Sequence, residues 1–217
     1  MGLNKFVTKV LVLSLPSRKD RRKAISKRLK NLGVAFQFVD AIPGADLEPY
    51  GGKHAGRNAS GCYCTHLLAV SMANVAKWKS VCILEDDVVF HKDFDNHLNR
   101  LFKDVPADWE MITMGCIHID QPEPVNDYIV RNKKSVGTWA YILRQSVYED
   151  FVKVRAGASN KNDVYTSMLM KDHAVYSPAK GIVGVAKDWS DIKQMNYDPE
   201  NFNFKYRDNV DYKEMDL

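Results

Sequence analysis

The chain has no long apolar run, little excess charge and few cysteines, and each of these absences excludes a class of protein. No stretch of 18 consecutive apolar residues occurs in the 217-residue sequence, so no membrane-spanning helix is expected. Residues 5–15 are too short for a signal peptide and lack a cleavage site of small residues, so we expect a cytoplasmic protein. The net charge of only +4 argues against a nucleic-acid-binding surface.

The four cysteines are spaced too irregularly to suggest a disulfide framework or a zinc site. Cys62 and Cys64 are separated by one residue, whereas the paired cysteines of structural zinc sites usually have at least two residues between them. Cys82 lies within an apolar run, and Cys116 stands alone. We therefore expect all four to be small buried hydrophobic residues without disulfides or bound metal.

The composition is that of an ordinary globular protein, with 45% hydrophobic and 27% charged residues. Apolar runs alternate with amphipathic helical patterns. This alternation predicts a single α/β, Rossmann-like domain whose mixed, mostly parallel central sheet is flanked by helices. The domain is expected to cover residues 1–192, and residues 193–217 are expected to form an extended or partly disordered polar tail.

Strands and helices are expected to alternate along most of the chain. The expected strands are residues 8–15, 34–39, 81–84, 109–115, 128–130, 137–143, 174–176 and 182–185. The expected helices are one that ends near residue 32 and is capped by Ser17 or Asp20, one over 61–79 capped by Ser60, and others over 94–103, 146–154 and 162–171.

A run of three carboxylates follows the expected strand over residues 81–84, and apolar residues resume at Val88. Strand geometry would place Glu85 and Asp87 on one face and Asp86 on the other. Two carboxylates on the same side can share one Mg²⁺ or Mn²⁺ ion, and acids beside a core need such a positive partner. The alternative interpretation, a solvated acidic turn or a set of helix-capping acids, is equally compatible with the sequence.

Basic residues gather at the turn between the first strand and the first helix. Arg18, Arg21 and Arg22 occupy this turn, and anions bind readily at the beginning of a helix. A cluster of this size suits a phosphorylated ligand better than a long nucleic acid. The rest of the helix has a basic face, which suits peripheral contact with an anionic membrane, although a solvated face is the simpler interpretation.

Six short motifs occur in a fixed order between residues 8 and 192. Together they resemble glycosyltransferase family 25, which contains lipooligosaccharide glycosyltransferases and procollagen galactosyltransferases. Residues 61–66 are similar to the family motif G-C-x-x-S-H, with Thr65 in place of serine, and residues 84–88 match L-E-D-D-V. The other matching segments are residues 13–22, 39–44, 137–143 (G-T-x-A-Y-x-L) and 190–192 (S-D-I). The chain departs from the family after Gly115, where it is short, and after residue 192.

The resemblance implies a GT-A fold, a nucleotide-sugar donor and inversion at the anomeric carbon. Known members mostly use UDP-galactose or UDP-glucose, and the carboxylate run then takes the place of a D-x-D motif. On this basis Mn²⁺ or Mg²⁺ is expected as cofactor, held by Asp87 with Glu85 and Asp191. Asp188 could also complete this site, although a surface acid is the simpler interpretation.

The resemblance also assigns residues to the donor and to the transfer step. Donor-binding residues are expected to be Arg18, Arg22, Glu85, Asp86 and Thr138. Core packing is the simpler interpretation for His66 and Trp139, with a ligand contact by His66 and stacking of Trp139 on a sugar as the alternatives.

An inverting transfer needs a base that takes the proton of the acceptor hydroxyl. Asp163, at the start of a helix, is the candidate base, and helix capping is its alternative role. The acceptor is expected to be a hydroxyl of a glycan or a protein, and neither nucleic acid nor a transmembrane segment is expected.

Two other functions remain open at the level of the sequence. A sugar-phosphate nucleotidyltransferase also combines an α/β fold with basic residues and acidic metal ligands, but no G-x-G-x-x-x-R-type signature follows the first strand. A nucleotide-sugar-binding protein without turnover is the second alternative, against which the intact carboxylate run argues.

Overall fold

The computed structural model describes residues 2–47, 56–155, 162–190, 195–197 and 210–216. Its centre is an eight-stranded mixed sheet in the order β2-β1-β3-β10-β5-β11-β8-β7. Within this sheet β10 and β8 run against the direction of the other strands, so the sheet is mixed and mostly parallel, as predicted. The strands in this order are Gln37–Asp40, Lys9–Ser14, Ser80–Glu85, Ala140–Arg144, Met111–Thr113, Val175–Pro178, Ile129–Arg131 and Glu123–Pro124.

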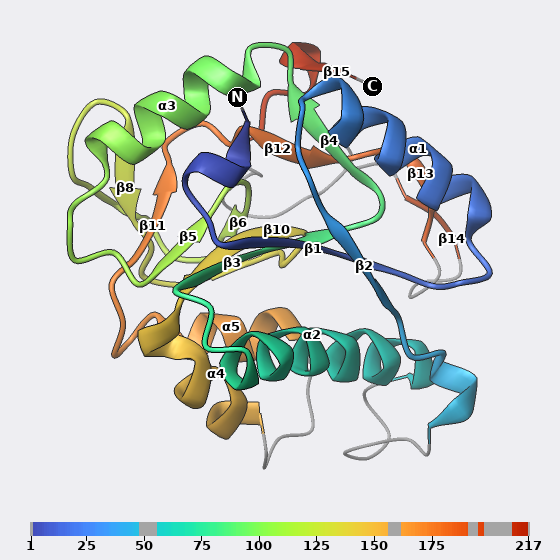
Figure 1. Cartoon of the computed structure of the whole chain (residues 1–217). Coiled ribbons are helices and arrows are strands. Elements are labelled where there is room, and N and C mark those ends of the chain that lie inside the picture. The colour runs from blue at the N-terminus through green and yellow to red at the C-terminus, as the bar shows by residue number, and fades with distance from the viewer. Residues whose placement is uncertain (1, 48–55, 156–161, 191–194, 198–209, 217) are drawn as a thin grey trace.

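Helices cover both faces of the sheet (Figure 1). One face carries α1 (Lys19–Asn31) and α3 (Phe94–Asp104), and the other carries α2 (Arg57–Val75), α4 (Tyr148–Arg155) and α5 (Asn162–Leu169). The four 3₁₀ turns are η1 (Leu3–Lys5), η2 (Gly44–Asp46), η3 (Gln145–Val147) and η5 (Tyr212–Glu214). Within the described part of the chain, none of the helices combines the length and apolarity needed to cross a membrane.

The central strands are buried because both of their faces are covered. In β1, Val10 and Val12 pack in the cluster beneath α1 and α3, while Leu11 and Leu13 pack in the cluster above α2 and α4. This division follows from the two-residue period of a strand, which sends successive side chains to opposite faces. The apolar run that predicted β1 therefore serves two separate cores.

The carboxylate run does not lie in one strand. β3 ends at Glu85, the chain turns at Asp86 and Asp87, and β4 (Val88–His91) joins a second sheet of order β12-β4-β15. The predicted strand over residues 81–84 is therefore confirmed as part of β3, with the carboxylates at its carboxyl end, whereas the sequence did not indicate that β4 is a separate strand. β12 is Val183–Val185 and β15 is Met215–Asp216.

The starts of α1 and α2 differ from the prediction, whereas α3 and α5 begin at the predicted residues. The residue before α1 is Arg18, so neither Ser17 nor Asp20 occupies the cap position. The residue before α2 is Gly56, and Ser60 lies buried within the helix instead of capping it. The end of α1 is as predicted, because Gly33 follows it with a φ of +63°, which glycine adopts without strain.

Residues around the sheet edge and near the carboxyl end form further small strands. The region expected to be a loop over 117–136 contains two antiparallel pairs, β7 with β8 and β6 (Ile117–His118) with β9 (Ser135–Val136). β13 (Asp188–Ser190) pairs with β14 (Met195–Tyr197). Met215 is buried, and β15 pairs with β4, so residues 210–216 pack onto the domain instead of forming a free tail. The boundary at residue 192 stays a prediction.

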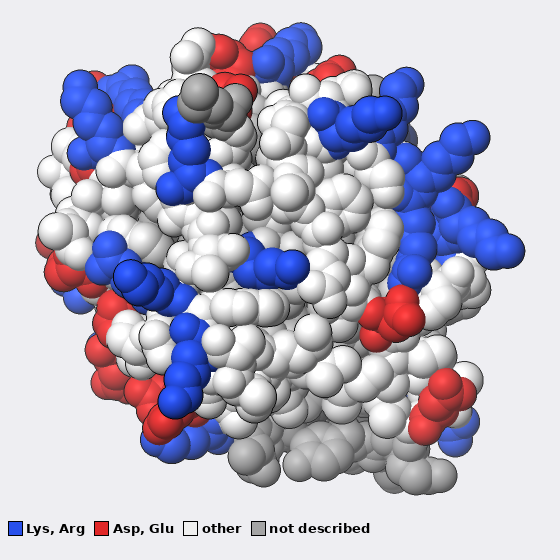
Figure 2. All heavy atoms as spheres, in the orientation of Figure 1, with Lys and Arg blue, Asp and Glu red and all other residues white. Residues whose placement is uncertain are grey.

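The exposed face of α1 is basic, as expected. Its lysines at positions 19, 23, 27 and 30 are all exposed. Figure 2 shows Lys and Arg side chains gathered along the edge of the molecule that α1 forms, while the acidic side chains on this face are scattered. Helix α1 buries Ile25 and Leu29 on its other side.

Candidate functional site

A pocket of about 290 Å³ opens at the carboxyl ends of β1 and β3. Ligands of open α/β sheets bind in the crevice outside these strand ends. One wall is the segment after β2, residues 41–45, and the adjoining wall is the first half of α2. Leu13, Leu15 and Ile42 make part of the lining apolar, and Glu85 and Asp86 contribute carboxylates.

The wall formed by α2 depends on a close approach to the segment after β2. A side chain at Gly61 would place its Cβ 2.4 Å from the carbonyl oxygen of Ile42, so only glycine fits there. Thr65 accepts a hydrogen bond from the Ile42 N–H (2.9 Å) and donates one to the Gly61 carbonyl (2.7 Å). These contacts explain why residues 61–66 need glycine and a hydroxyl four residues later, and threonine supplies this hydroxyl as well as serine would.

Two of the three carboxylates converge on one arginine. Arg21 Nη1 lies 3.1 Å from Asp86 Oδ1 and 3.0 Å from Asp87 Oδ2, and its Nε lies 3.0 Å from Asp188 Oδ2. Ser14, at the end of β1, donates a hydrogen bond to Asp86 Oδ2 (2.6 Å). The predicted alternation, with Asp86 facing away from Asp87, is therefore wrong, because both acids lie in the turn after β3.

The arginine at the centre of this cluster was named as a phosphate contact but not placed among the expected donor-binding residues. Arg21 lies on α1, three positions after Arg18, so both face the strand ends. The basic turn was a usable signal for the cluster. The sequence did not indicate which of its arginines meets the acids.

Asp87 carries a carboxylate that the protein itself does not fully satisfy. Its Oδ1 is buried and, within the described part of the chain, has no hydrogen-bond partner. The pKa of Asp87 is raised to about 7. Burial is the main cause and the neighbouring charge of Glu85 is the second, while Arg21 opposes the rise. Binding of a proton or of a further positive charge would therefore stabilise the Asp87 carboxylate.

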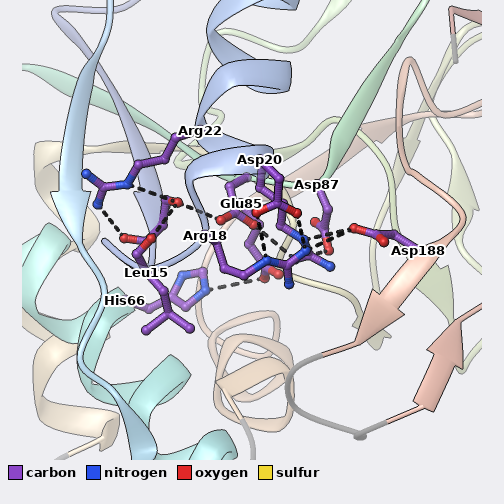
Figure 3. A network of polar contacts seen from close by, with 11 residues as sticks. Leu15, Arg18, Asp20, Arg22, His66, Glu85, Asp87 and Asp188 are labelled. Carbon is purple, nitrogen blue, oxygen red and sulfur yellow. Dashed lines mark hydrogen bonds and ion pairs between the residues drawn. The ribbon is translucent and has the colours of Figure 1, made fainter.

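Glu85 points to a different partner from the other two acids. Its Oε1 lies 3.4 Å from His66 Nε2, and His66 Nδ1 lies 2.9 Å from the Tyr141 hydroxyl. Figure 3 shows the contact between His66 and Glu85 beside the cluster of arginines and acids. His66 is buried, as predicted, but it also lines the pocket, which its place in a helical pattern did not indicate.

The two arginines expected to bind the donor lie on either side of the acid cluster. Arg18 is paired with Asp20 (2.9 Å) and with Asp188 (3.4 Å), and its hydrogen bond lowers the pKa of Asp20 to about 2. Arg22 reaches the end of β2 instead, where it pairs with Asp40 (2.5 Å). Arg18 therefore joins the cluster, whereas Arg22 lies between the ends of β1 and β2.

Thr138 and Trp139 are not among the residues that line the pocket. Thr138 is buried just before β10. Trp139 is a core residue, as expected, and its Nε1 donates to the Val183 carbonyl (3.0 Å). Asp163 lies in the first turn of α5, and Asp191 falls outside the described residues.

None of the four cysteines, all of which lie in the described part of the chain, forms a disulfide. Cys82 and Cys116 are buried, as predicted, but Cys62 and Cys64 are partly exposed on α2. The expectation of four buried cysteines is therefore wrong for this pair. Cys62 also lines the pocket.

Comparisons with known proteins show what this chain is similar to. Procollagen galactosyltransferase 1-B from Xenopus laevis is 27% identical over 136 residues, which cover 52% of this chain and 22% of that protein. The human inactive glycosyltransferase 25 family member 3 is 29% identical over 126 residues, which cover 49% of this chain and 21% of that protein. The aligned part of the chain thus spans about a fifth of the length of these relatives.

The fold is also found in a solved structure. The crystal structure of A197 from STIV has a TM-score of 0.50 and 11% sequence identity, with 80% of this chain and 81% of that chain covered. This likeness concerns the fold alone, and the predicted α/β architecture, a mixed and mostly parallel sheet flanked by helices, is confirmed. Residues 7–129 match the sequence profile described as glycosyltransferase family 25 (LPS biosynthesis protein). Since this match covers more than half of the sequence and includes the carboxylate turn, the chain belongs to glycosyltransferase family 25.

Proposed function

We propose that this chain is an inverting glycosyltransferase that moves a hexose, galactose or glucose, from a UDP-sugar to a hydroxyl of a glycan or a protein. The observation that carries the proposal is the pocket at the strand ends, where carboxylates and arginines meet. Family membership supports sugar transfer, and the name of the Xenopus laevis relative supports galactose. Because another relative is named inactive, the chemistry has to be supported by this chain's own residues.

The pocket suits the nucleoside part of the donor. Its volume of about 290 Å³ is at the lower end of the range for small-molecule sites, and it combines an apolar wall with a few polar groups. Leu13, Leu15 and Ile42 offer apolar surface for a planar base. Glu85 offers carboxylate oxygens that accept hydrogen bonds from ribose hydroxyls.

The carboxylates have the chemistry that a hard divalent cation requires. Asp86 and Asp87 supply only oxygen ligands, which Mn²⁺ and Mg²⁺ prefer. The unpartnered Oδ1 of Asp87 fits such an ion, since a cation would satisfy a buried oxygen that the protein leaves without a hydrogen bond. When bound, the ion would neutralise charge on the diphosphate leaving group. Asp191 stays a predicted further ligand.

Fixed positive charge next to these acids supports binding of the diphosphate. Arg21 has 10% of its side chain exposed and Arg18 has 17% exposed, so both are held in place rather than free in solvent. Charge that is oriented before the reaction stabilises a developing anion without reorganisation. Arg22 pairs with Asp40 at the end of β2 and not with the acids after β3. Its proposed role is therefore limited to holding the donor.

Asp163 is proposed as the base that takes the proton of the acceptor hydroxyl. It lies in the first turn of α5, on the face of the sheet that also carries α2. In an Asp163→Asn variant, donor binding measured by calorimetry should persist while sugar transfer falls. Loss of donor binding and transfer together would instead assign Asp163 a structural role.

The proposal is tested by measuring UDP release from a panel of UDP-sugars, with Mn²⁺ and with EDTA. Many transferases slowly hydrolyse their donor, so the acceptor need not be known. Metal-dependent release from one UDP-hexose is expected for the wild type and should be lost in Asp87→Ala. The matched control is Asp127→Ala, which changes an acid that is 82% exposed and pairs with Arg100 away from the pocket.

Three other outcomes would change the interpretation. UDP-sugar binding by calorimetry without release would indicate a nucleotide-sugar-binding protein. Pyrophosphate release from a nucleoside triphosphate and a sugar phosphate would indicate a nucleotidyltransferase. Neither binding nor release with any UDP-sugar would refute the proposed donor class.

A further inference from the structure

Three side chains of different chemistry meet at the wall of the pocket, next to the arginine cluster. Cys62, His66 and Glu85 each direct one potential ligand atom to a common point, and these atoms lie within 4.8 Å of one another. Cys62 and His66 are four residues apart on α2, so they share one face of the helix. Glu85 ends β3 and faces them across the pocket.

The donor set differs from that of Asp86 and Asp87. A thiolate and an imidazole nitrogen favour a borderline or soft ion such as Zn²⁺, whereas carboxylates alone favour Mg²⁺ or Mn²⁺. We propose that Cys62, His66 and Glu85 form a binding site for Zn²⁺ or a similarly soft divalent cation. This site is separate from the oxygen-only cation site proposed at the turn after β3.

The environment of His66 orients it as a metal ligand. Its Nδ1 lies 2.9 Å from the hydroxyl of Tyr141, and both residues are fully buried. When Nδ1 carries the proton and donates it to this hydroxyl, the lone pair of Nε2 faces Glu85. Histidines that bind metals commonly donate their other ring N–H to such a partner, which fixes both the tautomer and the ring orientation.

The geometry requires only a small movement of the more exposed ligands. Ligand distances of about 2.0–2.3 Å in a tetrahedral zinc site place ligand atoms roughly 3.3–3.8 Å apart. The three atoms therefore have to approach one another by about 1 Å from their limit of 4.8 Å. Cys62 is partly exposed and Glu85 has 28% of its side chain exposed, so both have room to move, while buried His66 stays in place.

Binding would exchange a proton for the ion. The Cys62 thiol loses its proton to solvent as the sulfur–metal bond forms, and Nε2 of His66 and one oxygen of Glu85 complete three protein ligands. The fourth position faces the pocket, as in zinc sites that keep one position open. If Glu85 also holds the donor ribose, which rests on the proposed function, the ion and the donor would compete.

The test follows metal binding directly, so it does not depend on transferase activity. Metal-free protein is titrated with Cd²⁺, and the ultraviolet absorption of the cadmium–thiolate bond is recorded. Zn²⁺ affinity is then measured by competition with a chromophoric chelator. One equivalent of Cd²⁺ should produce the absorption in the wild type, and Cys62→Ser should abolish it and weaken Zn²⁺ binding by at least ~10-fold.

Cys64→Ser is the matched control on the same helix. Cys64 is also partly exposed, but it lies two residues further on and outside the cluster, and burial raises the pKa of its thiol. The control should keep the Cd²⁺ absorption and the Zn²⁺ affinity of the wild type. His66→Gln should lower Zn²⁺ affinity by ~10-fold or more, provided that its melting curve shows a folded protein.

Several results of these titrations would overturn the proposal. Absence of cadmium–thiolate absorption in the wild type, or an unchanged signal in Cys62→Ser, would exclude this site. Loss of the signal in Cys64→Ser but not in Cys62→Ser would show that Cys64 binds the ion and would refute the proposal. Because Cys62→Ser replaces a single atom of a partly exposed side chain, it decides the question even if His66→Gln fails to fold.

Discussion

Replacing Asp87 by asparagine should stabilise the protein, and the gain should grow as the pH rises. Asp87 has 16% of its side chain exposed, and its Oδ1 is buried without a hydrogen-bond partner among the described residues. Asparagine has nearly the same shape and carries no charge. The variant therefore removes the cost of a buried charge while it leaves the packing of the turn after β3 almost unchanged.

The size of the effect follows from the raised pKa. Burial, with Glu85 as a second cause, moves the pKa of Asp87 from 3.8 to about 7 against the pull of Arg21. At 1.36 kcal/mol per pKa unit this rise corresponds to an upper limit of about 4 kcal/mol. This limit already includes the pull of Arg21. Because the unfolded chain has lost part of its proton by pH ~4.5 and a buried charge is partly relieved by relaxation of its surroundings, we expect about 2 kcal/mol.

The sign depends on which state holds the proton more tightly. Between pH ~4 and pH ~7 the folded protein keeps the Asp87 proton while the unfolded chain, with a pKa near 3.9, has released it. The free energy of unfolding of the wild type therefore falls through this range because of Asp87, and this contribution is constant above it. Asp87→Asn lacks this contribution, so its advantage over the wild type appears across the same range.

The assay compares urea unfolding of both proteins at pH ~4.5 and pH ~8, in EDTA. The variant minus wild-type difference in unfolding free energy should be about 2 kcal/mol larger at the higher pH. Taking this difference between two pH values cancels any effect of the substitution on packing. Asp20→Asn is the matched control, because Asp20 is exposed, its pKa is lowered to about 2, and it stays ionised at both pH values.

A difference between variant and wild type that is the same at both pH values would refute the reasoning. It would mean that Asp87 titrates normally and that Arg21 fully compensates its charge. A wild type that gains stability over the variant as the pH rises would show that the ionised carboxylate stabilises the fold. Either result would also weaken the argument for a cation at Asp87.

Three further outcomes are expected. Gly61→Ala should lower the free energy of unfolding in urea by about 1–3 kcal/mol, because the added Cβ would lie 2.4 Å from the Ile42 carbonyl oxygen, and a variant as stable as the wild type would contradict this close approach. Thr65→Val should cost about 1–3 kcal/mol, since it leaves the Ile42 N–H without its acceptor, whereas Thr65→Ser keeps the hydroxyl and should cost less. A loss in urea unfolding as large for Thr65→Ser as for Thr65→Val would contradict this role of the hydroxyl. Mn²⁺ at 100 times its Kd should raise the Tm of the wild type by about 5–10 °C in scanning calorimetry, and an equal rise in Asp87→Asn would exclude Asp87 as a ligand.

Local patterns were sufficient to predict most of the elements around the site. The apolar runs predicted β1 and β3 because a strand buried on both faces needs apolar residues at every position. Gly33 ended α1 because only glycine adopts its positive φ without strain. The order of short motifs placed Gly61 and the carboxylates in one family, and the profile match confirmed that family.

The starts of α1 and α2 and the path through the carboxylates could not be predicted in the same way. Ser60 was a reasonable cap by its residue type, but the helix begins earlier, at Arg57, because Gly56 precedes it and α2 packs against η2. Apolar residues resume with Val88 directly after the carboxylates, and the sequence does not show that they belong to a different sheet from β3. In that sheet β4 pairs with strands near the carboxyl end of the chain.

The sequence by itself determined which segments are buried, which family the chain resembles and which acids stand together at a strand end. Only the tertiary structure decided the partners of these acids. Arg21 meets Asp86 and Asp87 across 65 and 66 positions of the chain, because β1 and β3 pair in a register that brings Leu13 opposite Glu85. Contacts of this kind depend on strand register and helix direction, which are set by the packing of the whole domain and not by the residues of either segment.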